Sequence, residues 1–468
     1  MSKEKGVKIG LETHVQLDTD SKLFCSCSNS PSEVPNTNVC EICLGMPGSK
    51  PSVNKKAINY SLKAAISLGC EVNTNFFFSR KTYFYPDMSK DYQITQYEIP
   101  MGEDGEIELD GRTIGIKRVH LEEDPAKLVH KGGTISESKY TLVDYNRSGT
   151  PLIEVVTKPD LKSPKEARKF LQKLTRILEY LKIYDLSSEL TIRTDANISL
   201  EGGARVEVKN ITGTKAIERA LSYEIRRHKN LKERGREVER ETRSYDQERQ
   251  VTTPLRKKEA EEDYGYIFEP DLSGFEYKGK DIERMKEEIP ELPDQKLERF
   301  VEEYGLKEEI AKSLITDLEL GKAFEEVVEE IDPDTASSWF TDHLKKTLNY
   351  HGISFSRSGI KTEWIIDLLE ELKDDKISER SAEKVTREMV EKKKPPMEII
   401  EEKGLERTQK SELSTMVSQV LKENPDAVED WNQGKDEAIN FLVGKVMQKS
   451  KGQADPKETR ELILQELE

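Results

Sequence analysis

Long apolar runs are absent from this sequence of 468 residues. Hydrophobic residues make up 35% of the chain and charged residues another 35%, and the mean hydropathy is −0.73. A membrane-spanning helix needs about 20 mostly apolar residues, and no such run occurs. The opening residues, MSKEKGVKIGLETHVQL, are charged but lack the apolar segment of a secretory signal. We therefore expect a cytoplasmic protein with no membrane association.

Several common catalytic motifs are also missing. The sequence has no GxxxxGK[ST] phosphate loop, no GxGxxG after a strand-like run and no GxSxG nucleophile elbow. If ATP is used, it must be held through a metal ion and carboxylates rather than by a glycine-rich phosphate loop. The absence of these motifs excludes the best-known ways of binding a nucleotide or activating a serine.

An excess of positive charge is missing too, because the formal net charge is −16. This argues at first against nucleic-acid binding, which depends on Lys and Arg. The segment 205–259, however, holds 16 Lys and Arg against 10 Asp and Glu, a local excess of 16 − 10 = 6. Such a segment is compatible with an RNA-facing surface. A solvated helix face rich in ion pairs would have the same composition, so both interpretations stay open.

The first part of the chain, to about residue 290, mixes short strand-like runs with a few helices. The expected strands include Val7–Leu11, Thr113–Val119, Pro151–Val156 and Ala204–Lys209, and the expected helices are Lys55–Leu68, Pro164–Leu181 and Thr214–Glu233. Because the runs lack regular βαβ spacing, residues 1–290 are predicted to form an α+β domain with a mainly antiparallel sheet.

The character of the sequence changes after IPELPD, residues 289–294, where Glu, Lys and Leu recur at helical spacing. We predict an all-α helical domain over residues 291–400. Consecutive prolines in the segment 392–396 interrupt helix. The remaining residues, 401–468, are predicted to form a small helical tail.

Only five cysteines occur, and four of them cluster. Cys25 and Cys27 are followed, after twelve intervening residues, by Cys40 and Cys43. Two thiolate pairs on tight turns can complete a tetrahedral Zn²⁺ shell. The spacing therefore predicts a structural zinc knuckle near residues 25–43, with unrelated buried thiols as the alternative. Cys70 stands alone and is expected to be a small buried hydrophobe.

Acidic residues accompany several strand-like runs. Glu12 and His14 lie two residues apart in such a run, so their side chains share a face. The other acidic candidates of this kind, with their neighbours, are His120, Glu122, Glu123, Asp124, Asp144, Arg147, Glu154, Asp195 and Asn197. Converging carboxylates and an imidazole would suit Mg²⁺, whereas surface or ion-paired carboxylates would show the same spacing. The remaining histidines considered, His130, His228, His343 and His351, are expected to be structural.

Aromatic and basic residues alternate in the segment 80–96. Cations interleaved with aromatic rings can stack a base and pair with phosphate. A packed aromatic cluster at a strand end is the alternative. The candidates for substrate or ATP binding in this segment are Arg80, Lys81, Tyr83, Tyr85 and Tyr92.

Long strings spread over nearly the whole chain carry a family resemblance. They include GLETHVQL (10–17), PNTNVCEICLGMPGSKP (35–51), RKTYFYPDMSKDYQITQYEIP (80–100), HLEEDPAKL (120–128), LVDYNRSGTPLIEVVTKPD (142–160), RTDANISL (193–200), VEVKNI (206–211), EPDL (269–272) and FLVGKVMQKSKGQADP (441–456). Together these strings resemble the B subunits of glutamine-dependent aminoacyl-tRNA amidotransferases.

The resemblance implies a reaction. In this family ATP phosphorylates the side-chain carboxylate of Asp-tRNA(Asn) or Glu-tRNA(Gln), and ammonia converts the acyl phosphate to the amide. Mg²⁺ offsets the charge of phosphate and carboxylate. The implied Mg²⁺ ligands are Glu12, His14, Glu123 and Glu154. The residues implied around them, in catalysis or in substrate and ATP binding, are Glu122, Asp195, Arg147, Arg193 and Lys209.

The resemblance also implies partners. An amidase-type glutaminase subunit would supply ammonia, and a small third subunit would complete a heterotrimer. The helical regions would hold the misacylated tRNA, with Lys445, Lys449 and Lys451 of the tail as candidate contacts. An ordinary solvated helix face is the alternative for these lysines.

Two other functions stay open at this point. A noncatalytic, zinc-containing tRNA-binding adaptor would keep the basic segment and the tail but would not need the acidic residues. A stand-alone ATP-dependent ligase using free ammonia would form the amide without a glutaminase. Replacing Glu12 or Glu123 by Gln separates the adaptor from the amidotransferase, because the adaptor would be unaffected.

Overall fold

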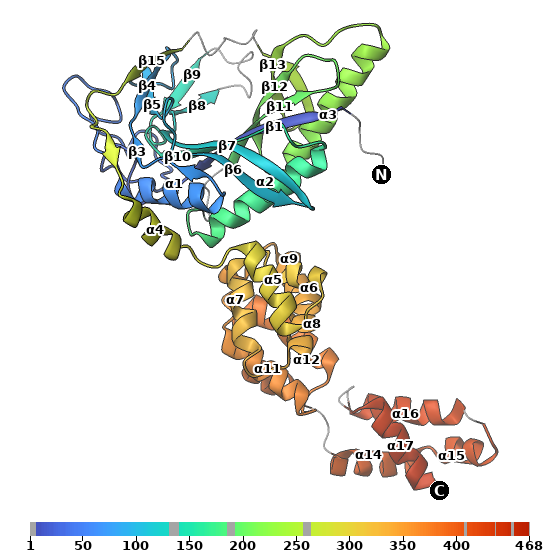
Figure 1. Cartoon of the computed structure of the whole chain (residues 1–468). Coiled ribbons are helices and arrows are strands. Elements are labelled where there is room, and N and C mark those ends of the chain that lie inside the picture. Colours follow the sequence, from blue (N-terminus) through green and yellow to red (C-terminus); the bar gives the residue numbers. More distant parts are fainter. Residues whose placement is uncertain are drawn as a thin grey trace. The chain divides into compact units, whose positions relative to one another are not determined.

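The computed structural model describes residues 6–130, 140–184, 192–255, 264–406, 410–435, 437–450 and 454–467. The chain divides into two compact units, Met1–Pro293 and Asp294–Glu468. The first is rich in strands and the second is helical (Figure 1). The predicted α+β class, with helical regions after the sheet, is confirmed. Among the described residues, no helix combines the length and apolarity needed to cross a membrane.

A nine-stranded sheet organises the first unit. Its order is β14-β13-β12-β11-β1-β10-β7-β6-β2, and all neighbours are antiparallel except the parallel pair β12 and β13. The strands are β1 (Lys8–Gln16), β2 (Glu71–Val72), β6 (Gly102–Leu109), β7 (Arg112–Glu123), β10 (Pro151–Thr157), β11 (Ile192–Ser199), β12 (Val206–Thr212), β13 (Glu241–Asp246) and β14 (Val251–Pro254). The long strand β1 thus lies at the middle of the sheet.

Three smaller sheets accompany the main one. Their orders are β15-β4-β5, β16-β3 and β8-β9. The strands are β3 (Asn75–Phe76), β4 (Ser79–Thr82), β5 (Tyr92–Thr95), β8 (Lys127–His130), β9 (Thr141–Asp144), β15 (Gly265–Phe268) and β16 (Phe275–Glu276). The aromatic and basic segment 80–96 therefore begins on β4 and reaches β5.

Alternation along β1 separates the two faces of the main sheet. Ile9, Leu11 and Val15 are almost fully buried and belong to the core of the first unit. Because successive side chains of a strand point to opposite faces, Glu12 and His14 lie on the other face, which we call the site face. The core includes apolar residues of the helices α1 (Lys55–Ser67), α2 (Pro164–Tyr180) and α3 (Thr214–Glu233).

Local sequence explains where α1 and α2 begin. The Asn54 side chain accepts hydrogen bonds from the amides of Lys56 and Ala57 in the first turn of α1. The Ser163 side chain accepts one from the amide of Glu166, and Pro164 occupies the first turn of α2. Short polar side chains satisfy amides that have no partner within the helix, and proline costs nothing at this position. The predicted helix starts at 55, 164 and 214 are confirmed.

The second unit contains two separate hydrophobic clusters, one within residues 300–400 and one within 413–463. The helices are α4 (Gly279–Glu287), which precedes this unit, and α5 (Pro293–Tyr304), α6 (Glu308–Leu314), α7 (Leu318–Val327), α8 (Pro333–Ser338), the π-helical segment η2 (Trp339–Leu344), α9 (Lys345–His351), α10 (Phe355–Ser358), α11 (Thr362–Lys373), α12 (Glu379–Lys392), α13 (Pro396–Lys403), α14 (Lys410–Glu423), α15 (Pro425–Asn432), α16 (Glu437–Lys449) and α17 (Pro456–Leu467).

A buried carboxylate ties α3 to the edge of the main sheet. Glu224 is fully buried, and its carboxylate lies 2.8 Å from the Arg227 guanidinium. The Arg243 guanidinium and the His228 imidazole each approach it to 3.2 Å. The Thr252 hydroxyl also donates to it. Burial alone would raise the pKa of Glu224, but His228, Arg227 and Thr252 outweigh it and lower the pKa to about 2.

Replacement of Glu224 by Gln should therefore remove a pH-dependent part of the stability. The folded-state pKa of about 2 lies below the ordinary value of 4.5, so ionised Glu224 stabilises the fold above about pH 4.5. That stabilisation, roughly 3 kcal/mol, is lost as the pH falls toward 2. Urea unfolding of wild type and Glu224→Gln at pH 7 and at pH 4 measures this effect. The difference between their free energies of unfolding should be smaller at pH 4 than at pH 7. An equal gap at both values would contradict the assignment.

Candidate active site and metal centre

Three neighbouring strands bring two histidines and two glutamates together on the site face. His14 of β1 pairs with Glu154 of β10, and Glu154 pairs with His120 of β7. The Glu154 Oε2 atom lies 3.4 Å from His14 Nε2 and 3.2 Å from His120 Nε2. Glu122, two residues beyond His120, approaches the same imidazoles at 3.9 and 3.6 Å. We call these four residues the His–Glu group.

The His–Glu group is electrostatically coupled. Burial alone would lower the pKa of His14, but Glu154, Glu122 and Asp195 outweigh it and raise the pKa to about 9. The same balance between burial and the carboxylates raises the pKa of His120. Burial would raise the pKa of Glu154, yet the two imidazoles hold it well below its usual range. Burial would likewise raise the pKa of Glu122, but the two imidazoles lower it. Both carboxylates are thus ionised near neutral pH, and the imidazoles supply the balancing positive charge.

A divalent cation could balance the same carboxylates in place of a proton on His14. The ligand atoms of His14, Glu122 and Glu154 all lie within 4.8 Å of one another. Two carboxylates and an imidazole suit a hard or borderline divalent ion. Neutral imidazole is the form that binds a metal, so an arriving cation would displace the proton that the high pKa of His14 retains. These donor atoms therefore fit a divalent cation.

Glu12 and Asp195 lie beside the His–Glu group, on adjacent strands. They are paired across β1 and β11, two positions along from the pair of His14 and Arg193. Glu12 Oε1 accepts a hydrogen bond of 2.8 Å from Asn197 Nδ2. Burial, together with the charges of Glu154, Glu207 and Asp195, raises the pKa of Glu12. Its carboxylate is therefore another point where a cation or a proton would be held.

Glu123 has different neighbours. Its carboxylate forms a buried ion pair with Lys90 and accepts a hydrogen bond of 2.8 Å from the Ile94 amide. Successive residues of a strand point to opposite faces, so Glu122 rather than Glu123 joins His120. The resemblance implied Glu123 as a ligand of the same ion as His14 and Glu154, and the structure does not bring it into their group.

Asp124 is a buried anchor whose role the sequence did not indicate. Its carboxylate accepts hydrogen bonds from Arg193, at 2.6 Å, and from Gln16, at 2.7 Å, and lies 3.6 Å from Arg147. Asp124 thus fixes Arg193 by hydrogen bonds and provides a counter-charge to Arg147, which donates its hydrogen bonds to the carbonyl oxygens of Pro125 and Ala126. Asp124 lies just beyond the end of β7, so nothing in the strand pattern before it pointed to these partners.

Replacing Asp124 by Asn should destabilise the fold by roughly 2 to 3 kcal/mol, because both arginines would lose their buried counter-charge. Asp104→Asn is the matched control. Its ion pair with Lys158 is exposed, and losing it should cost less than about 1 kcal/mol. The two costs can be compared by urea unfolding. A similar small effect at both positions would show that Asp124 does not carry this role.

The aromatic and basic segment is largely engaged within the protein. Arg80 donates two hydrogen bonds to the buried Glu269, at 2.7 and 2.8 Å, and lies 4.4 Å from the centre of the Tyr92 ring. Lys81 lies 4.8 Å from the centre of the Tyr264 ring, which also contacts Tyr83 edge-on.

Two further candidates for substrate binding differ in their surroundings. Tyr85, like its neighbour Phe84, is exposed. Lys209 of β12 lies on the site face and forms an ion pair of 3.7 Å with Asp195. Tyr85 and Phe84 are therefore the aromatic side chains of the segment that are open to a ligand.

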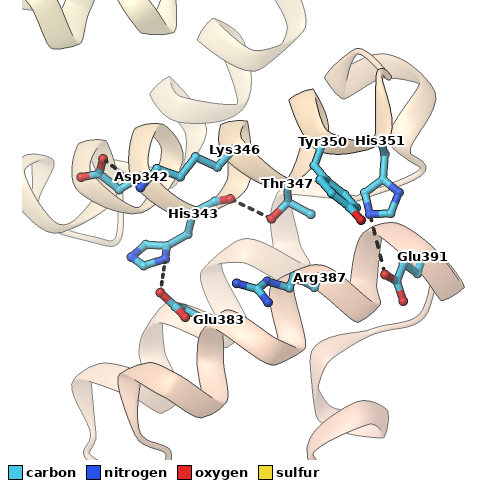
Figure 2. Close-up of a pocket in the computed structure, with 9 residues that line it drawn as sticks. All are labelled: Asp342, His343, Lys346, Thr347, Tyr350, His351, Glu383, Arg387 and Glu391. Carbon is cyan, nitrogen blue, oxygen red and sulfur yellow. Dashed lines mark hydrogen bonds and ion pairs between the residues drawn. The ribbon is translucent and has the colours of Figure 1, made fainter.

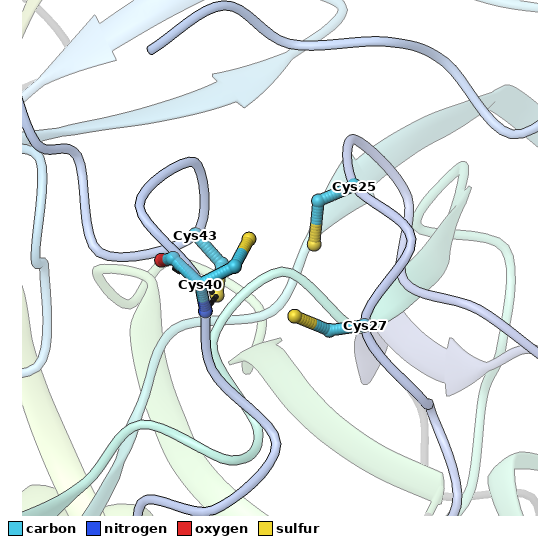
Figure 3. A group of neighbouring side chains, drawn as sticks. All are labelled: Cys25, Cys27, Cys40 and Cys43. Atoms are coloured by element: carbon cyan, nitrogen blue, oxygen red, sulfur yellow. Dashed lines mark hydrogen bonds between the residues drawn. The ribbon is translucent and has the colours of Figure 1, made fainter.

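The four clustered cysteines converge from two turns (Figure 3). The sulfurs of Cys25, Cys27, Cys40 and Cys43 all lie within 4.8 Å of one another, and no disulfide joins them. Hydrogen bonding with Cys25, together with the Cys40 amide and the Lys22 ammonium, outweighs burial and lowers the pKa of Cys43 to about 5. Four convergent thiols, one of them readily ionised, fit a tetrahedral Zn²⁺ ion.

The cysteine cluster is connected to the candidate active site through a carbonyl group. The Cys43 carbonyl accepts hydrogen bonds from the hydroxyls of Ser89, at 2.7 Å, and Ser148, at 3.3 Å. Ser89 precedes Lys90, the partner of Glu123, and Ser148 follows Arg147. The fold of the cluster therefore positions two segments that contact the site.

The second unit contains a cavity of about 590 Å³ along η2, α9 and α12 (Figure 2). Two ion pairs border it: His343 with Glu383, at 3.1 Å, and His351 with Glu391, at 3.7 Å. Each pair joins the segment η2–α9 to α12. These contacts agree with the structural role expected for both histidines.

The candidate tRNA contacts of the tail lie on α16. Lys445 lies 5.4 Å from the centre of the Phe441 ring, and Lys449 forms an ion pair of 2.8 Å with Glu423 of α14. Lys451 falls outside the described residues. The positions of Lys445 and Lys449 are compatible with either a ligand surface or a solvated helix face.

Comparisons with known proteins bear on all of these features. Residues 7–283 match the GatB/GatE catalytic domain, and residues 322–467 match the GatB domain. The B subunits of aspartyl/glutamyl-tRNA(Asn/Gln) amidotransferases are similar along nearly their whole length. That of Methanospirillum hungatei is 47% identical over 96% of this chain and 95% of its own, and that of Methanothermobacter thermautotrophicus is 47% identical over 98% and 99%. For Methanosarcina barkeri the identity is 44% over 99% and 98%. This chain therefore belongs to the GatB/GatE family of amidotransferase subunits, as its sequence resemblance indicated.

Proposed function

We propose that this chain is the transamidating subunit that converts Asp-tRNA(Asn), Glu-tRNA(Gln) or both to Asn-tRNA(Asn) and Gln-tRNA(Gln). Family membership supports the reaction class, a glutamine-hydrolysing ligase acting in protein biosynthesis. The observation that carries the proposal is the His–Glu group, where two ionised carboxylates and two imidazoles meet on one sheet face. A noncatalytic adaptor would not need a group whose donor atoms can hold a divalent cation.

The reaction balances in two steps. A side-chain carboxylate oxygen of the aminoacyl group attacks the γ-phosphorus of ATP, forming an acyl phosphate and releasing ADP. Ammonia then attacks the acyl carbon, and phosphate leaves as the amide forms. A carboxylate is a poor electrophile, and phosphorylation supplies the leaving group that it lacks. The site must therefore gather the negative charges of carboxylate and triphosphate and hold them against each other.

We propose that His14, Glu122 and Glu154 hold Mg²⁺, with Glu12 and Asp195 next to it. When bound, Mg²⁺ would neutralise part of the phosphate charge and keep ATP in line with the attacking oxygen. His120 orients Glu154 and Glu122 from the far side. Arg193, fixed by Asp124, and Arg147, beside the same carboxylate, offer positive charge to the substrate, and Lys209 does so beside Asp195. Glu123 and Lys90 serve as a neighbouring polar support.

The remaining assignments concern partners and parts of the chain. We propose that an amidase-type glutaminase supplies the ammonia and that a small third subunit completes the complex. Residues 1–290 would carry the reaction, with structural Zn²⁺ in the cysteine cluster. Residues 291–400 and the tail, 401–468, would hold tRNA, with Lys445, Lys449 and Lys451 among its contacts. The reaction belongs in the cytoplasm, where tRNA is charged.

The decisive experiment reconstitutes the complex and supplies each tRNA charged with labelled Asp or Glu, together with ATP and glutamine. We expect amide formation that requires both ATP and glutamine. The two substrates, tested separately, define the specificity. If neither substrate is converted, the proposed function is wrong. If wild type and Glu12→Gln convert the substrates equally, the noncatalytic adaptor is favoured.

A further inference from the structure

A second cavity, of about 370 Å³, continues the site face beyond Glu12. Glu12 lines one end of it, next to the His–Glu group. Its lining also includes four cations: Lys8 of β1, Lys117 and Arg118 of β7, and Arg205 before β12. We call this the basic cavity. Glu12 is the single acidic residue among four cations in its lining, although the chain as a whole carries a net charge of −16.

An irregularity in β7 brings two of these cations into the same cavity. Arg118 is paired with Val156 of β10, whereas Thr157 is paired with Ile116, so Lys117 has no partner on β10. This extra residue is a β-bulge, which bends a strand and re-aims its side chains. In a regular strand Lys117 and Arg118 would point to opposite faces. With the bulge, both line the basic cavity.

The cations of the basic cavity are not neutralised by the surrounding protein. In the described part of the chain, no ion pair is formed by Lys8, Lys117, Arg118 or Arg205, whereas the nearby Lys158 is paired with Asp104. The Arg118 Nε atom is buried without a hydrogen-bond partner. Buried polar groups in proteins are nearly always satisfied, so this buried N–H donor points to an anionic ligand.

Phosphate is the ligand chemistry that fits this lining. Arginine and lysine bind phosphate through charge-assisted hydrogen bonds, and four cations exceed what one carboxylate can balance. Gly10, which has no side chain, is also among the lining residues. Glu12 borders both the basic cavity and the His–Glu group, so a phosphorylated ligand here would have its reactive end directed toward the metal centre.

We propose that the basic cavity is the phosphate-binding subsite of this active site, with Arg118 and Arg205 as its principal contacts. This assignment rests on the proposed function and extends it to residues that no family motif above includes. The phosphate belongs either to the triphosphate of ATP or to the 3′-terminal backbone of the tRNA. Both sources share this chemistry, and kinetics and binding distinguish them.

The test uses the reconstituted complex with Arg118→Gln, and with Arg205→Gln as a second variant outside any strand. Arg284→Gln, an exposed arginine of α4 paired with Glu288, is the matched control. KM is measured for ATP at saturating tRNA and for tRNA at saturating ATP. A lost charged hydrogen bond corresponds to roughly a 10- to 100-fold change. If only KM for ATP rises by that factor, the basic cavity binds the triphosphate of ATP. If only KM for tRNA rises, it binds the tRNA backbone.

Direct binding separates a failure of this proposal from a failure of the proposed function. Equilibrium dialysis with ATP, and with uncharged tRNA, needs no turnover. If wild-type protein forms no amide but Arg118→Gln and Arg205→Gln weaken binding of either probe about 10-fold or more, the reaction is wrong and the phosphate site stands. If both variants fold, shown by unchanged thermal unfolding, and bind both probes like Arg284→Gln, the phosphate site is overturned.

Discussion

Replacing Glu154 by Gln should reduce amide formation by on the order of 100- to 1,000-fold, the range expected when a charge that organises the transition state is lost. Glu154 is the centre of the His–Glu group, because its carboxylate contacts both His14 and His120. Gln keeps the shape but can neither balance two imidazoles nor bind a divalent cation as a carboxylate does. The measurement is single-turnover conversion of labelled aminoacyl-tRNA by the reconstituted complex.

A second readout for Glu154→Gln is independent of activity. Glu154 is a main reason why the pKa of His14 is raised to about 9 and why that of His120 is raised. Without its charge both values should fall toward the ordinary 6.5, which NMR titration of the histidines in metal-free protein can follow. Glu106→Gln, an exposed glutamate of β6, is the control and should change neither quantity. Full activity in Glu154→Gln would exclude the His–Glu group as the catalytic centre.

The second large effect is expected from the cysteine cluster. Cys40→Ser should lose one equivalent of bound zinc per chain and destabilise the first unit by at least about 3 kcal/mol, since structural zinc sites contribute on the order of 10 kcal/mol of binding free energy. Activity should fall too, because Ser89 and Ser148 are fixed by the Cys43 carbonyl. Metal content by mass spectrometry and urea unfolding measure the first two effects.

Cys70→Ser is the matched control for the cysteine cluster. Cys70 lies outside the cluster, and its variant should retain the full zinc content. Restoring zinc to chelated wild-type protein should restore stability and activity together. Zinc-free wild-type protein of undiminished stability would contradict the structural role of the cluster.

Local patterns predicted much of this site. Alternation in the run from Gly10 to Leu17 correctly placed Glu12 and His14 on one face, and helical periodicity correctly located α1, α2 and α3. The spacing of the four cysteines predicted a cluster whose sulfurs the structure brings together. Each of these features depends on residues close in sequence, where the periods of strand and helix are sufficient evidence.

Long-range pairing set the limit of prediction. His14, Glu154 and His120 meet only because β1 lies beside β10 and β10 beside β7, an order and register that no local pattern contains. A difference of one residue decides that Glu122, and not Glu123, faces this group. The bulge at Lys117 is equally invisible in sequence, since it depends on the mismatch between two strands. The family resemblance implied which residues take part in the reaction, whereas the pairing of the strands determines which of them lie together.

The ends of the main sheet restrict how this protein can associate with other chains. Its described outer strands are β2, with two residues, and β14, with four residues ending at Pro254. Short margins, and a proline that has no amide hydrogen to donate, offer little backbone for a foreign strand to join. Assembly by strand addition at these margins is thereby disfavoured. At the main sheet, other molecules would therefore contact side chains rather than backbone edges, so changes at exposed residues can alter such contacts without disturbing the sheet that carries the chemistry.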